Sequence, residues 1–302
     1  MQLKERFLKL KKEKKCLVLG HNYQKPEIQE VSDYLGDSYD LSIRAREIKS
    51  DMILFCGVDF MAETAAILNP NKKVLMPDLK AKCPMAKMLN PEIIKTYRRK
   101  FPEASVAVYI NTTAVTKAEA DVVFTSSNGT KICSALNSQK ILVGPDFNLS
   151  QFIQKQLPDK EIIPIPADGY CYVHKIFSPV DIKSTNKKAK ILVHPEVDME
   201  LQALADFTGS TAQIFNSPKK IEATEFLIGT EIGLIHRMKK EYSEKKIHPL
   251  NGGAICKEMK MHTLPKAYKA LKEERPVIRV PEKIAIKAKK AIDRMLEIMD
   301  EK

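Results

Sequence analysis

Short apolar runs alternate with amphipathic stretches along most of the chain. Runs rich in Val, Ile and Leu predict buried strands, and stretches with apolar residues three or four positions apart predict helices. Strands are expected at 16–20, 52–56, 73–77, 105–110, 122–126, 140–144, 162–166, 190–194, 213–216 and 225–229. Helices are expected at 2–14, 38–49, 59–68, 91–100, 148–157, 199–207, 231–241, 264–274 and 281–299. This alternation predicts an α/β fold in which helices cover parallel sheets on both faces.

The pattern also repeats within the chain. The segment "DMILFCGVDFMAETAAILNPNKKVLMPD" at 51–78 is similar to "DVVFTSSNGTKICSALNSQKILVGPD" at 121–146 and, more loosely, to 224–251. Another strand precedes each copy, in "CLVLGHNY", "VAVYINT" and "ILVHPEV". We therefore expect three similar three-layer αβα domains with parallel sheets, arranged with pseudo-threefold symmetry around a central site.

Both ends of the chain are amphipathic and flank the three copies. We expect a first domain of residues 1–84 plus 260–302, a second of 85–171 and a third of 172–259. The final helix is expected to pack back on the first domain.

The strand that precedes each copy ends in two polar residues spaced by two positions. These pairs are His21 with Tyr23, Tyr109 with Asn111, and His194 with Glu196. Strand side chains alternate between faces, so the two members of a pair point the same way. Ligands of open α/β sheets bind beyond the carboxyl ends of the strands. The pairs therefore predict a site at these ends.

Three of the six cysteines, Cys83, Cys171 and Cys256, stand in loop sequence and follow the same spacing. The first two are as far apart along the chain as positions 21 and 109, and the last two are as far apart as positions 109 and 194. The cysteines and the first members of the polar pairs therefore share both separations. Both sets are expected to converge on one central pocket. The other cysteines lie inside strand or helix patterns and are expected to pack in the core: Cys16, Cys56 and Cys133.

The composition narrows the cellular setting and the class of partner. The net charge is +12, and the excess lies in Lys-rich terminal stretches that also contain Glu, which favours solvated helix faces over a nucleic-acid surface. The chain contains no Trp, and no basic run is interleaved with aromatic residues. No apolar run is long enough to cross a membrane and no export signal is apparent, so we expect a cytoplasmic protein without disulfides. A positive field favours anionic small substrates.

Three thiols in one pocket are compatible with two kinds of metal centre. Zinc would take three cysteines and a histidine, with His174 in "CYVH" as the fourth ligand. A [4Fe–4S] cluster held by three cysteines leaves one iron open as a Lewis acid. Structural zinc sites commonly use a short C-x₂₋₄-C spacing that these three lack, which favours the cluster.

Two loop segments favour an anionic ligand. "TSSNGTK" at 125–131 and "TGSTAQ" at 208–213 place small hydroxyl residues and Gly beside expected helix starts. Backbone N–H groups there can hold phosphate or carboxylate, although each segment alone is also an ordinary helix cap. Two rivals remain: an aconitase-like hydro-lyase that shares the open iron, and a non-enzymatic metal- or nucleic-acid-binding protein.

At this point the sequence resembles the quinolinate synthase family, the A protein of NAD biosynthesis. The resemblance rests on "HNYQKPEIQEVSDYLGDSYDLS", "KCPMA", "YINTTA", "TSSN", "GYCYVH", "HPE", "TGST" and "NGGAIC", which span the chain. It implies a [4Fe–4S] cluster and a condensation of iminoaspartate with dihydroxyacetone phosphate to give quinolinate, phosphate and water. It also implies an L-aspartate oxidase or dehydrogenase as the source of iminoaspartate, through transient contact.

The resemblance also implies roles for individual residues. The cluster ligands are expected to be Cys83, Cys171 and Cys256. The catalytic residues are expected to be His21, Tyr23, Tyr109, His194 and Glu196. Substrate contacts are expected from His21, Ser38, Tyr109, Asn111, Ser126, His174, His194, Glu196, Ser210 and Thr211. Longer members carry C-x-x-C-x-x-C at the third ligand, whereas Cys256 stands alone in "ICKEMKM", so thiol–disulfide switching is not expected there.

Overall fold

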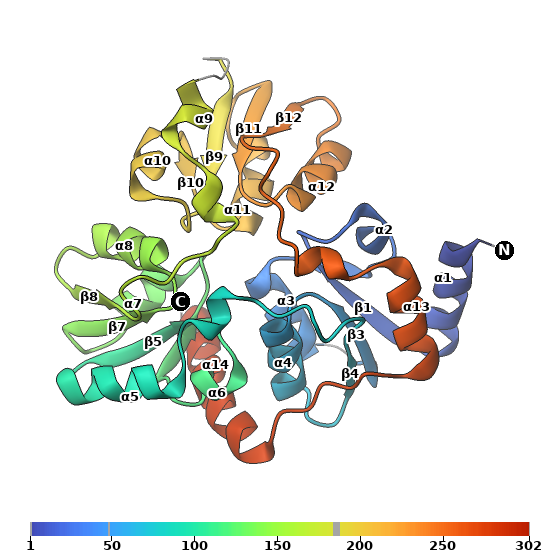
Figure 1. Ribbon diagram of the computed structural model, residues 1–302, viewed down its shortest axis with the longest axis horizontal. Coiled ribbons are helices and arrows are strands. Elements are labelled where there is room, and N and C mark those ends of the chain that lie inside the picture. Colours follow the sequence, from blue (N-terminus) through green and yellow to red (C-terminus); the bar gives the residue numbers. More distant parts are fainter. Residues whose placement is uncertain (1, 48, 184–187, 302) are drawn as a thin grey trace.

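Three parallel sheets form the framework of the chain. The computed structural model describes residues 2–47, 49–183 and 188–301, and within them the strands form three four-stranded sheets. The sheets have the orders β2-β1-β3-β4, β6-β5-β7-β8 and β10-β9-β11-β12, so each repeats one topology. We call each sheet with its helices a module. Figure 1 shows the three modules around a common centre, which confirms the expected α/β architecture of αβα layers.

Each module alternates strands with helices. The first contains α1 Leu3–Glu13, β1 Cys16–His21, α2 Pro26–Gln29, β2 Tyr34–Gly36, α3 Ser38–Glu47, β3 Met52–Cys56, α4 Asp59–Leu68, β4 Lys73–Leu75 and α13 Leu264–Glu273. The second contains α5 Pro91–Lys100, β5 Ser105–Tyr109, α6 Ala114–Lys117, β6 Val122–Phe124, α7 Gly129–Ser134, β7 Lys140–Gly144, α8 Phe147–Gln156, β8 Glu161–Pro164 and α14 Glu282–Asp300. The third contains α9 Pro179–Lys183, β9 Lys190–Val193, α10 Met199–Leu204, β10 Phe207–Thr208, α11 Thr211–Asn216, η3 Ser217–Lys219, β11 Glu225–Gly229, α12 Gly233–Glu241 and β12 Lys246–Pro249. Three further 3₁₀ turns lie in the connections: η1 Met85–Lys87, η2 His174–Ile176 and η4 Met259–Met261.

The central strands are apolar because helices cover both of their faces. In the first module, Leu19 and Phe55 belong to the core on one side of the sheet, whereas Val18 and Leu54 belong to the core on the other. Strand β1 pairs with β3 in parallel register, with Cys16 opposite Met52. The continuous apolar runs of the sequence therefore predict these strands well.

Each module ties its first strand to an aspartate by the same pair of bonds. Backbone N–H groups of Val18, Val106 and Ile191 donate to Asp33, Asp121 and Asp206 at 2.8, 2.7 and 2.8 Å. The same aspartates donate their own N–H groups back to the carbonyls of Val18, Val106 and Ile191. We call these three residues the strand-entry aspartates. They bind the chain at the amino ends of the sheets.

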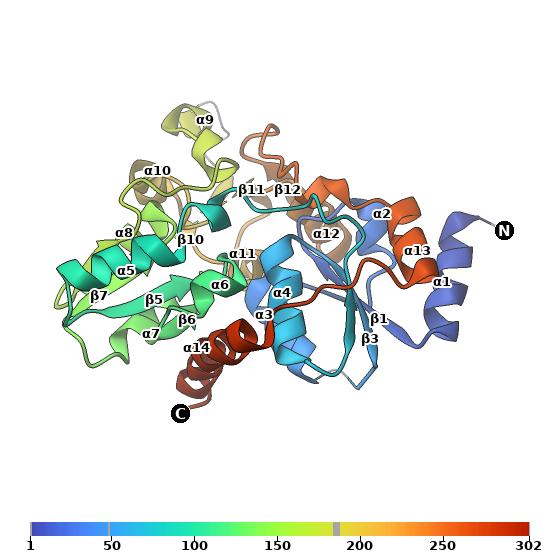
Figure 2. The ribbon, with the colours of Figure 1, turned by 60° about the horizontal axis from the view of Figure 1, so that its bottom comes forward.

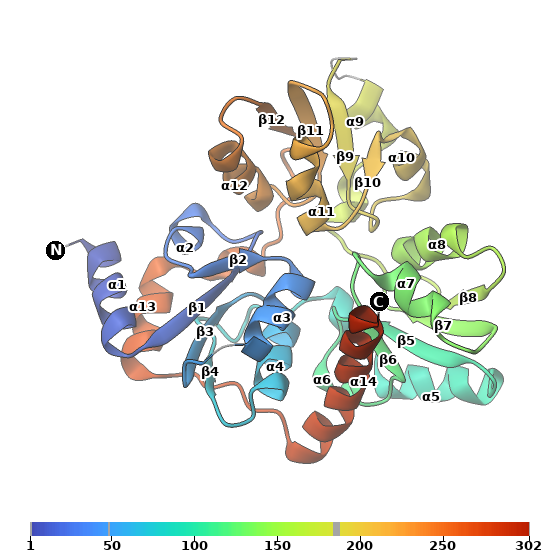
Figure 3. The ribbon, with the colours of Figure 1, turned by 180° about the vertical axis from the view of Figure 1, so that it is seen from behind.

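The last helix departs from its expected position. Helix α13 packs against α1 of the first module, but α14 packs mainly on β6 and α6 of the second, with a smaller contact to α4 of the first. Its buried residues Ala291, Ile292 and Met295 belong to the core of the second module. Figures 2 and 3 show α14, in red, beside this sheet. The expected domain boundaries at 84, 171 and 259 stay a prediction.

Several short elements differ from the sequence expectation. The strand expected at 213–216 is the helix α11, because Ser210 and Gln213 form a capping box that starts a helix. The strand of that region is the two-residue β10. The topology also realigns the internal repeat: β3-α4-β4 corresponds to β7-α8-β8, so 51–78 does not match 121–146. Among the described residues, no helix combines the length and hydropathy that a membrane span needs.

Candidate active site

The carboxyl ends of the strands from all three modules surround one cavity. The space between its walls is about 650 Å³, which includes open solvent. The lining includes most of the polar residues that the sequence predicts: His21, Tyr23, Ser38, Tyr109, Asn111, Ser126, His174, His194, Glu196, Thr211 and the thiol residues Cys83, Cys171 and Cys256. Residues as distant in the sequence as His21 and Cys256 therefore meet in one place, because three copies of one topology face each other.

The first module contributes the pair at the end of β1. The rings of His21 and Tyr23 lie 4.5 Å apart, nearly perpendicular, and the Tyr23 backbone N–H donates to Nδ1 of His21 at 3.1 Å. Burial lowers the pKa of His21 to about 3, so its imidazole is neutral near pH 7. Burial also raises the pKa of Tyr23 well above its usual value, so this phenol keeps its proton.

The second module contributes Tyr109 and Asn111. Tyr109 ends β5, and its ring stacks on Phe124 of the neighbouring strand with centroids 5.6 Å apart. Burial and the negative charge of Glu196 raise the pKa of Tyr109 well above its usual value. The Ser38 hydroxyl donates to Oδ1 of Asn111 at 3.4 Å, which joins the first module to the second at the cavity.

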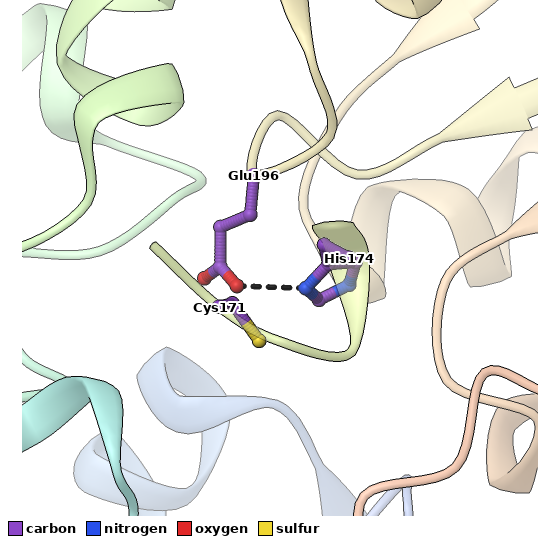
Figure 4. A group of neighbouring side chains, drawn as sticks. All are labelled: Cys171, His174 and Glu196. Atoms are coloured by element: carbon purple, nitrogen blue, oxygen red, sulfur yellow. Dashed lines mark ion pairs between the residues drawn. The ribbon is translucent and has the colours of Figure 1, made fainter. Parts of the chain in front are cut away.

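The third module contributes a buried carboxylate between two histidines. Nδ1 of His174 lies 2.8 Å from Oε2 of Glu196, as Figure 4 shows, and Nδ1 of His194 lies 3.9 Å from Oε1. The two imidazoles stack with centroids 4.6 Å apart. Burial opposes ionisation of Glu196, but the histidines outweigh it and lower the pKa of this carboxyl to about 2. Burial lowers the pKa of His194 to about 3.

A chain of contacts connects this carboxylate to Tyr23 across two modules. Nε2 of His174 lies 2.8 Å from the Thr230 hydroxyl, which lies 2.6 Å from the Tyr23 hydroxyl. Nδ1 of His174 lies 2.8 Å from Oε2 of Glu196, but it makes no hydrogen bond among the described residues. Two hydrogen bonds and one close contact thus join the phenol of Tyr23 to the carboxylate.

The three thiols have matching local surroundings. Each cysteine precedes a 3₁₀ turn, and the backbone N–H three residues later acts to lower the pKa of its thiol, from Ala86, His174 and Met259 respectively. Burial outweighs this effect and raises all three thiol pKa values, to about 12 for Cys256. Burial is what makes an ionised thiol costly here, and a bound metal removes that cost because coordination deprotonates the thiol.

One thiol also has other metal-ligating groups beside it. One potential ligand atom from each of Cys171, His174 and Glu196 lies within 4.8 Å of the others, and Figure 4 shows them converging from two segments. This group could hold a metal ion. The donor set of the cavity, three thiols with imidazole and carboxylate nearby, suits a soft metal centre.

The comparisons with known proteins agree with this geometry. The family model described as quinolinate synthetase A protein matches residues 5–297. The quinolinate synthase of Methanocaldococcus jannaschii is 49% identical, with 99% of each chain covered. The quinolinate synthase of Methanothermobacter thermautotrophicus is 46% identical, and the match covers 99% of each chain. That of Thermotoga maritima is 45% identical, and the match covers 98% of this chain and 99% of the relative. The chain belongs to the quinolinate synthase family.

Most of the hydroxyl residues predicted to bind anionic groups in this quinolinate synthase family member lie at the cavity. Ser38, Ser126 and Thr211 line the cavity, whereas Ser210 stands just behind it. Ser210 caps α11 by accepting from Gln213 N–H, and its hydroxyl donates to Oδ2 of Asp37 at 3.3 Å. The Ser210 side chain therefore caps the amino end of α11 and joins the third module to the first.

Four polar residues of this quinolinate synthase family site were not individually predicted from the sequence. Asp37, Tyr39 and Thr125 line the cavity, and Thr230 lies behind Tyr23. Asp37 accepts from the Ala212 N–H of the third module at 3.2 Å, and burial raises its pKa to about 6. Thr125 begins the predicted anion segment, and Asp37 directly follows β2, so the rule that sites lie at strand ends would have found Asp37 had β2 been recognised.

The remaining cysteines and histidines of the family member behave as structural residues. Cys16, Cys56 and Cys133 are buried in the module cores, as the sequence analysis expects. His262 is fully buried and donates from Nε2 to the Gly57 carbonyl at 2.8 Å. His248 is half-exposed at the edge of the third sheet.

Proposed function

We propose that this chain is a quinolinate synthase of de novo NAD biosynthesis. In this reaction iminoaspartate and dihydroxyacetone phosphate condense, lose phosphate and two waters, and close to quinolinate, which makes the protein a condensing transferase with dehydration steps. The observation that carries the proposal is the convergence of one cysteine and one polar pair from each module on a single cavity. The family membership supplies the reaction.

We propose a [4Fe–4S] cluster held by Cys83, Cys171 and Cys256. When bound, the cluster supplies one iron without a cysteine ligand, which acts as a Lewis acid towards substrate oxygen or nitrogen. The zinc alternative needs His174 as the fourth ligand. The three cysteines lack the short C-x₂₋₄-C spacing that is common in structural zinc sites, which argues against zinc.

The substrates carry carboxylates and a phosphate, and the cavity wall carries donors suited to them. Ser38, Ser126 and Thr211 present hydroxyls from three different modules, and Asn111 adds an amide. Such preorganised donors stabilise negative charge without having to reorganise during the reaction. We propose that these residues bind the anionic groups and hold the phosphate until it leaves.

The proton transfers are assigned to groups whose protonation states the site fixes. His21 is neutral and can accept a proton, and Tyr23 is protonated and can donate one. Tyr23 contacts Thr230, which contacts His174 beside Glu196, and these contacts hold the phenol in place for that donation. Tyr109 and His194 complete the catalytic set at the same wall.

The iron content tests the ligand assignment. Anaerobically purified protein should contain about four irons per chain and show a brown absorption that air bleaches. Changing any one of Cys83, Cys171 or Cys256 to Ala should abolish this absorption. Cys16→Ala, Cys56→Ala and Cys133→Ala are matched controls that should retain it, because those thiols are buried in the module cores. Equal behaviour of the two groups of variants would refute the assignment.

Product formation tests the reaction. Freshly generated iminoaspartate with dihydroxyacetone phosphate should give quinolinate with the iron-loaded protein. An aconitase-like hydro-lyase would instead add or remove water on a hydroxy acid and give no quinolinate. A reducing compartment suits three metal-binding thiols, so we propose the cytoplasm, where an enzyme producing iminoaspartate would supply the unstable substrate.

A further inference from the structure

A turn of the form Gly-x-acid follows the third strand of each module. It reads Gly57-Val58-Asp59 after β3, Gly144-Pro145-Asp146 at the end of β7, and Gly229-Thr230-Glu231 at the end of β11. Each acid precedes the cysteine of its own module by nearly the same number of positions. The acids therefore repeat with the cysteines.

Each acid faces the backbone of its cysteine. The Cys83 N–H donates to Oδ1 of Asp59 at 3.1 Å, and the Cys256 N–H donates to Oε1 of Glu231 at 3.1 Å. In the second module Asp146 stands at the matching place beside Cys171, but its Oδ2 has no hydrogen-bond partner among the described residues. The bond thus occurs in the first and third modules, and the second module repeats the placement of the acid.

A second bond fastens each cysteine loop to the same turn. The carbonyl two residues before the cysteine accepts a backbone N–H from the turn: Ala81 from Asp59 at 2.9 Å, Gly169 from Phe147 at 2.8 Å, and Ala254 from Ile232 at 3.0 Å. The loops of Cys83 and Cys256 are therefore held at two points beside the thiol, and the loop of Cys171 at one, on the rigid end of a central strand.

Burial makes these contacts costly to lose. Asp146 and Glu231 are 2% and 0% exposed. Removing the acceptor leaves a cysteine N–H without a partner at a site with little water, and the loop must then reorganise. The backbone of each cysteine sets the direction of its own thiol, so a shift of the backbone also moves the sulfur.

We infer that Asp59 and Glu231, through these bonds, and Asp146, through its matching placement, are positioning residues that hold the three cysteine ligands in place for the metal group. The inference rests on the proposed ligand role of the cysteines. Outer-shell partners of metal ligands commonly change metal retention by about 10- to 100-fold when they are removed. The three carboxyls act through the cysteine backbone and not on the substrate.

The test compares two sets of aspartate and glutamate residues in the same modules. Asp59→Ala, Asp146→Ala and Glu231→Ala should each shorten the half-life of the brown absorption in air by about 10-fold or more. The strand-entry aspartates are the matched control, because they bind backbone N–H groups in the same way at the opposite ends of the sheets. Asp33→Ala, Asp121→Ala and Asp206→Ala should leave the half-life within about twofold of the unmodified protein.

Conservative variants separate hydrogen bonding from charge. Asp59→Asn, Asp146→Asn and Glu231→Gln keep a carbonyl oxygen that can accept the cysteine N–H, so they should restore the half-life to within about twofold. Rapid loss of absorption in the Asn and Gln variants would overturn the inference, even if an Ala variant failed to fold. So would Ala variants that behave like the strand-entry controls.

A readout without iron separates this inference from the proposed function. In iron-free protein, peptides containing Cys83, Cys171 or Cys256 should exchange amide hydrogen faster in the Ala variant of their own module than in the strand-entry controls. Cysteine variants that kept their iron would refute the ligand assignment. The exchange result would still show whether the carboxyls hold the cysteine loops in place. Unchanged exchange with intact cysteine ligands would reject the positioning role alone.

Discussion

At the scale of single residues, burial decides which groups carry charge. His262 lies outside the cavity lining, is fully buried, and donates to the Gly57 carbonyl at 2.8 Å. Burial lowers its pKa to about 4, against 6.5 for an unperturbed histidine. Between these two pH values the unfolded chain binds a proton at this residue that the folded chain does not.

This difference predicts an acid-sensitive stability. Because the unfolded state gains the proton, His262 lowers the free energy of unfolding by about 1.4 kcal/mol per pH unit as pH falls from 6.5 towards 4. His262→Gln should therefore flatten the fall in stability between pH 7 and pH 5, measured by urea titration. His248→Gln, at a half-exposed position, should leave the slope unchanged. An unaltered slope in His262→Gln would contradict the buried neutral state.

The sequence contained enough information to predict much of the site at this scale, but not all. The pairs that begin at 21, 109 and 194 were predictable because strand alternation and the spacing they share with the cysteines point to one place. Thr230 was not predictable, since its role comes from its contacts with Tyr23 and His174 in other segments. The helix-capping role of Ser210 likewise depends on a local bond that spacing does not reveal.

At the scale of elements, α14 shows how a helix can serve a module distant in sequence. Its buried side chains fill the core of the second module, although the chain between α8 and α14 builds the whole third module. Apolar periodicity predicts the helix itself and its buried face. It does not say which sheet that face covers, and α14 contacts the second module more than the first, on which it was expected.

The packing of α14 predicts a sharp contrast along one helix. Met295→Ala removes a side chain that is 0% exposed, and should lower the free energy of unfolding by about 2–5 kcal/mol. Ile286→Ala, at a position that is 54% exposed, should change it by less than about 0.5 kcal/mol. Urea titration of both variants checks this. A small loss for Met295→Ala would mean that α14 does not complete the core.

Short strands were the elements that the sequence predicted least well. Strands β2, β10 and β12 have three, two and four residues, and all lie at sheet edges. A half-covered edge strand needs few apolar residues, so the hydrophobic pattern does not mark it. The central strands carry continuous apolar runs and were predicted almost to the residue.

At the scale of the whole molecule, buried charges lie where modules meet. Lys117 of α6 is fully buried, lies over the Phe60 ring of the first module at 5.4 Å, and donates to the Thr112 carbonyl. Burial lowers its pKa to about 8, and the nearby charge of Glu63 opposes that fall. The Glu63 carboxylate also accepts from Ala114 N–H of the second module at 2.8 Å.

This arrangement predicts coupling between Lys117 and Glu63. Lys117→Met and Glu63→Gln should each destabilise the protein, because each leaves the other group without its opposite charge in a buried place. The double variant should lose less than the two single losses together, with a coupling energy of about 0.5–3 kcal/mol in a double-mutant cycle. Lys95→Met with Glu92→Gln, an exposed pair within α5, should be additive. Additive behaviour of Lys117 and Glu63 would exclude electrostatic coupling between these modules.

The threefold architecture was predictable because two independent residue classes share one pair of spacings. The sequence did not show which strands of the three modules correspond. Strands β3 and β6 both follow a loop and precede a helix, so they look alike in sequence. Only the sheet order shows that β3 corresponds to β7 and β11.

The position of α14 bears on how the chain is made. Synthesis proceeds from the amino end, and a domain folds once all of its parts have emerged. The apolar face of β6 awaits a helix that begins at Glu282, so this face stays uncovered until the whole third module and α14 have emerged from the ribosome. Translation that stops early, before Met295, would release a nascent chain with its central sheet bare and prone to aggregate.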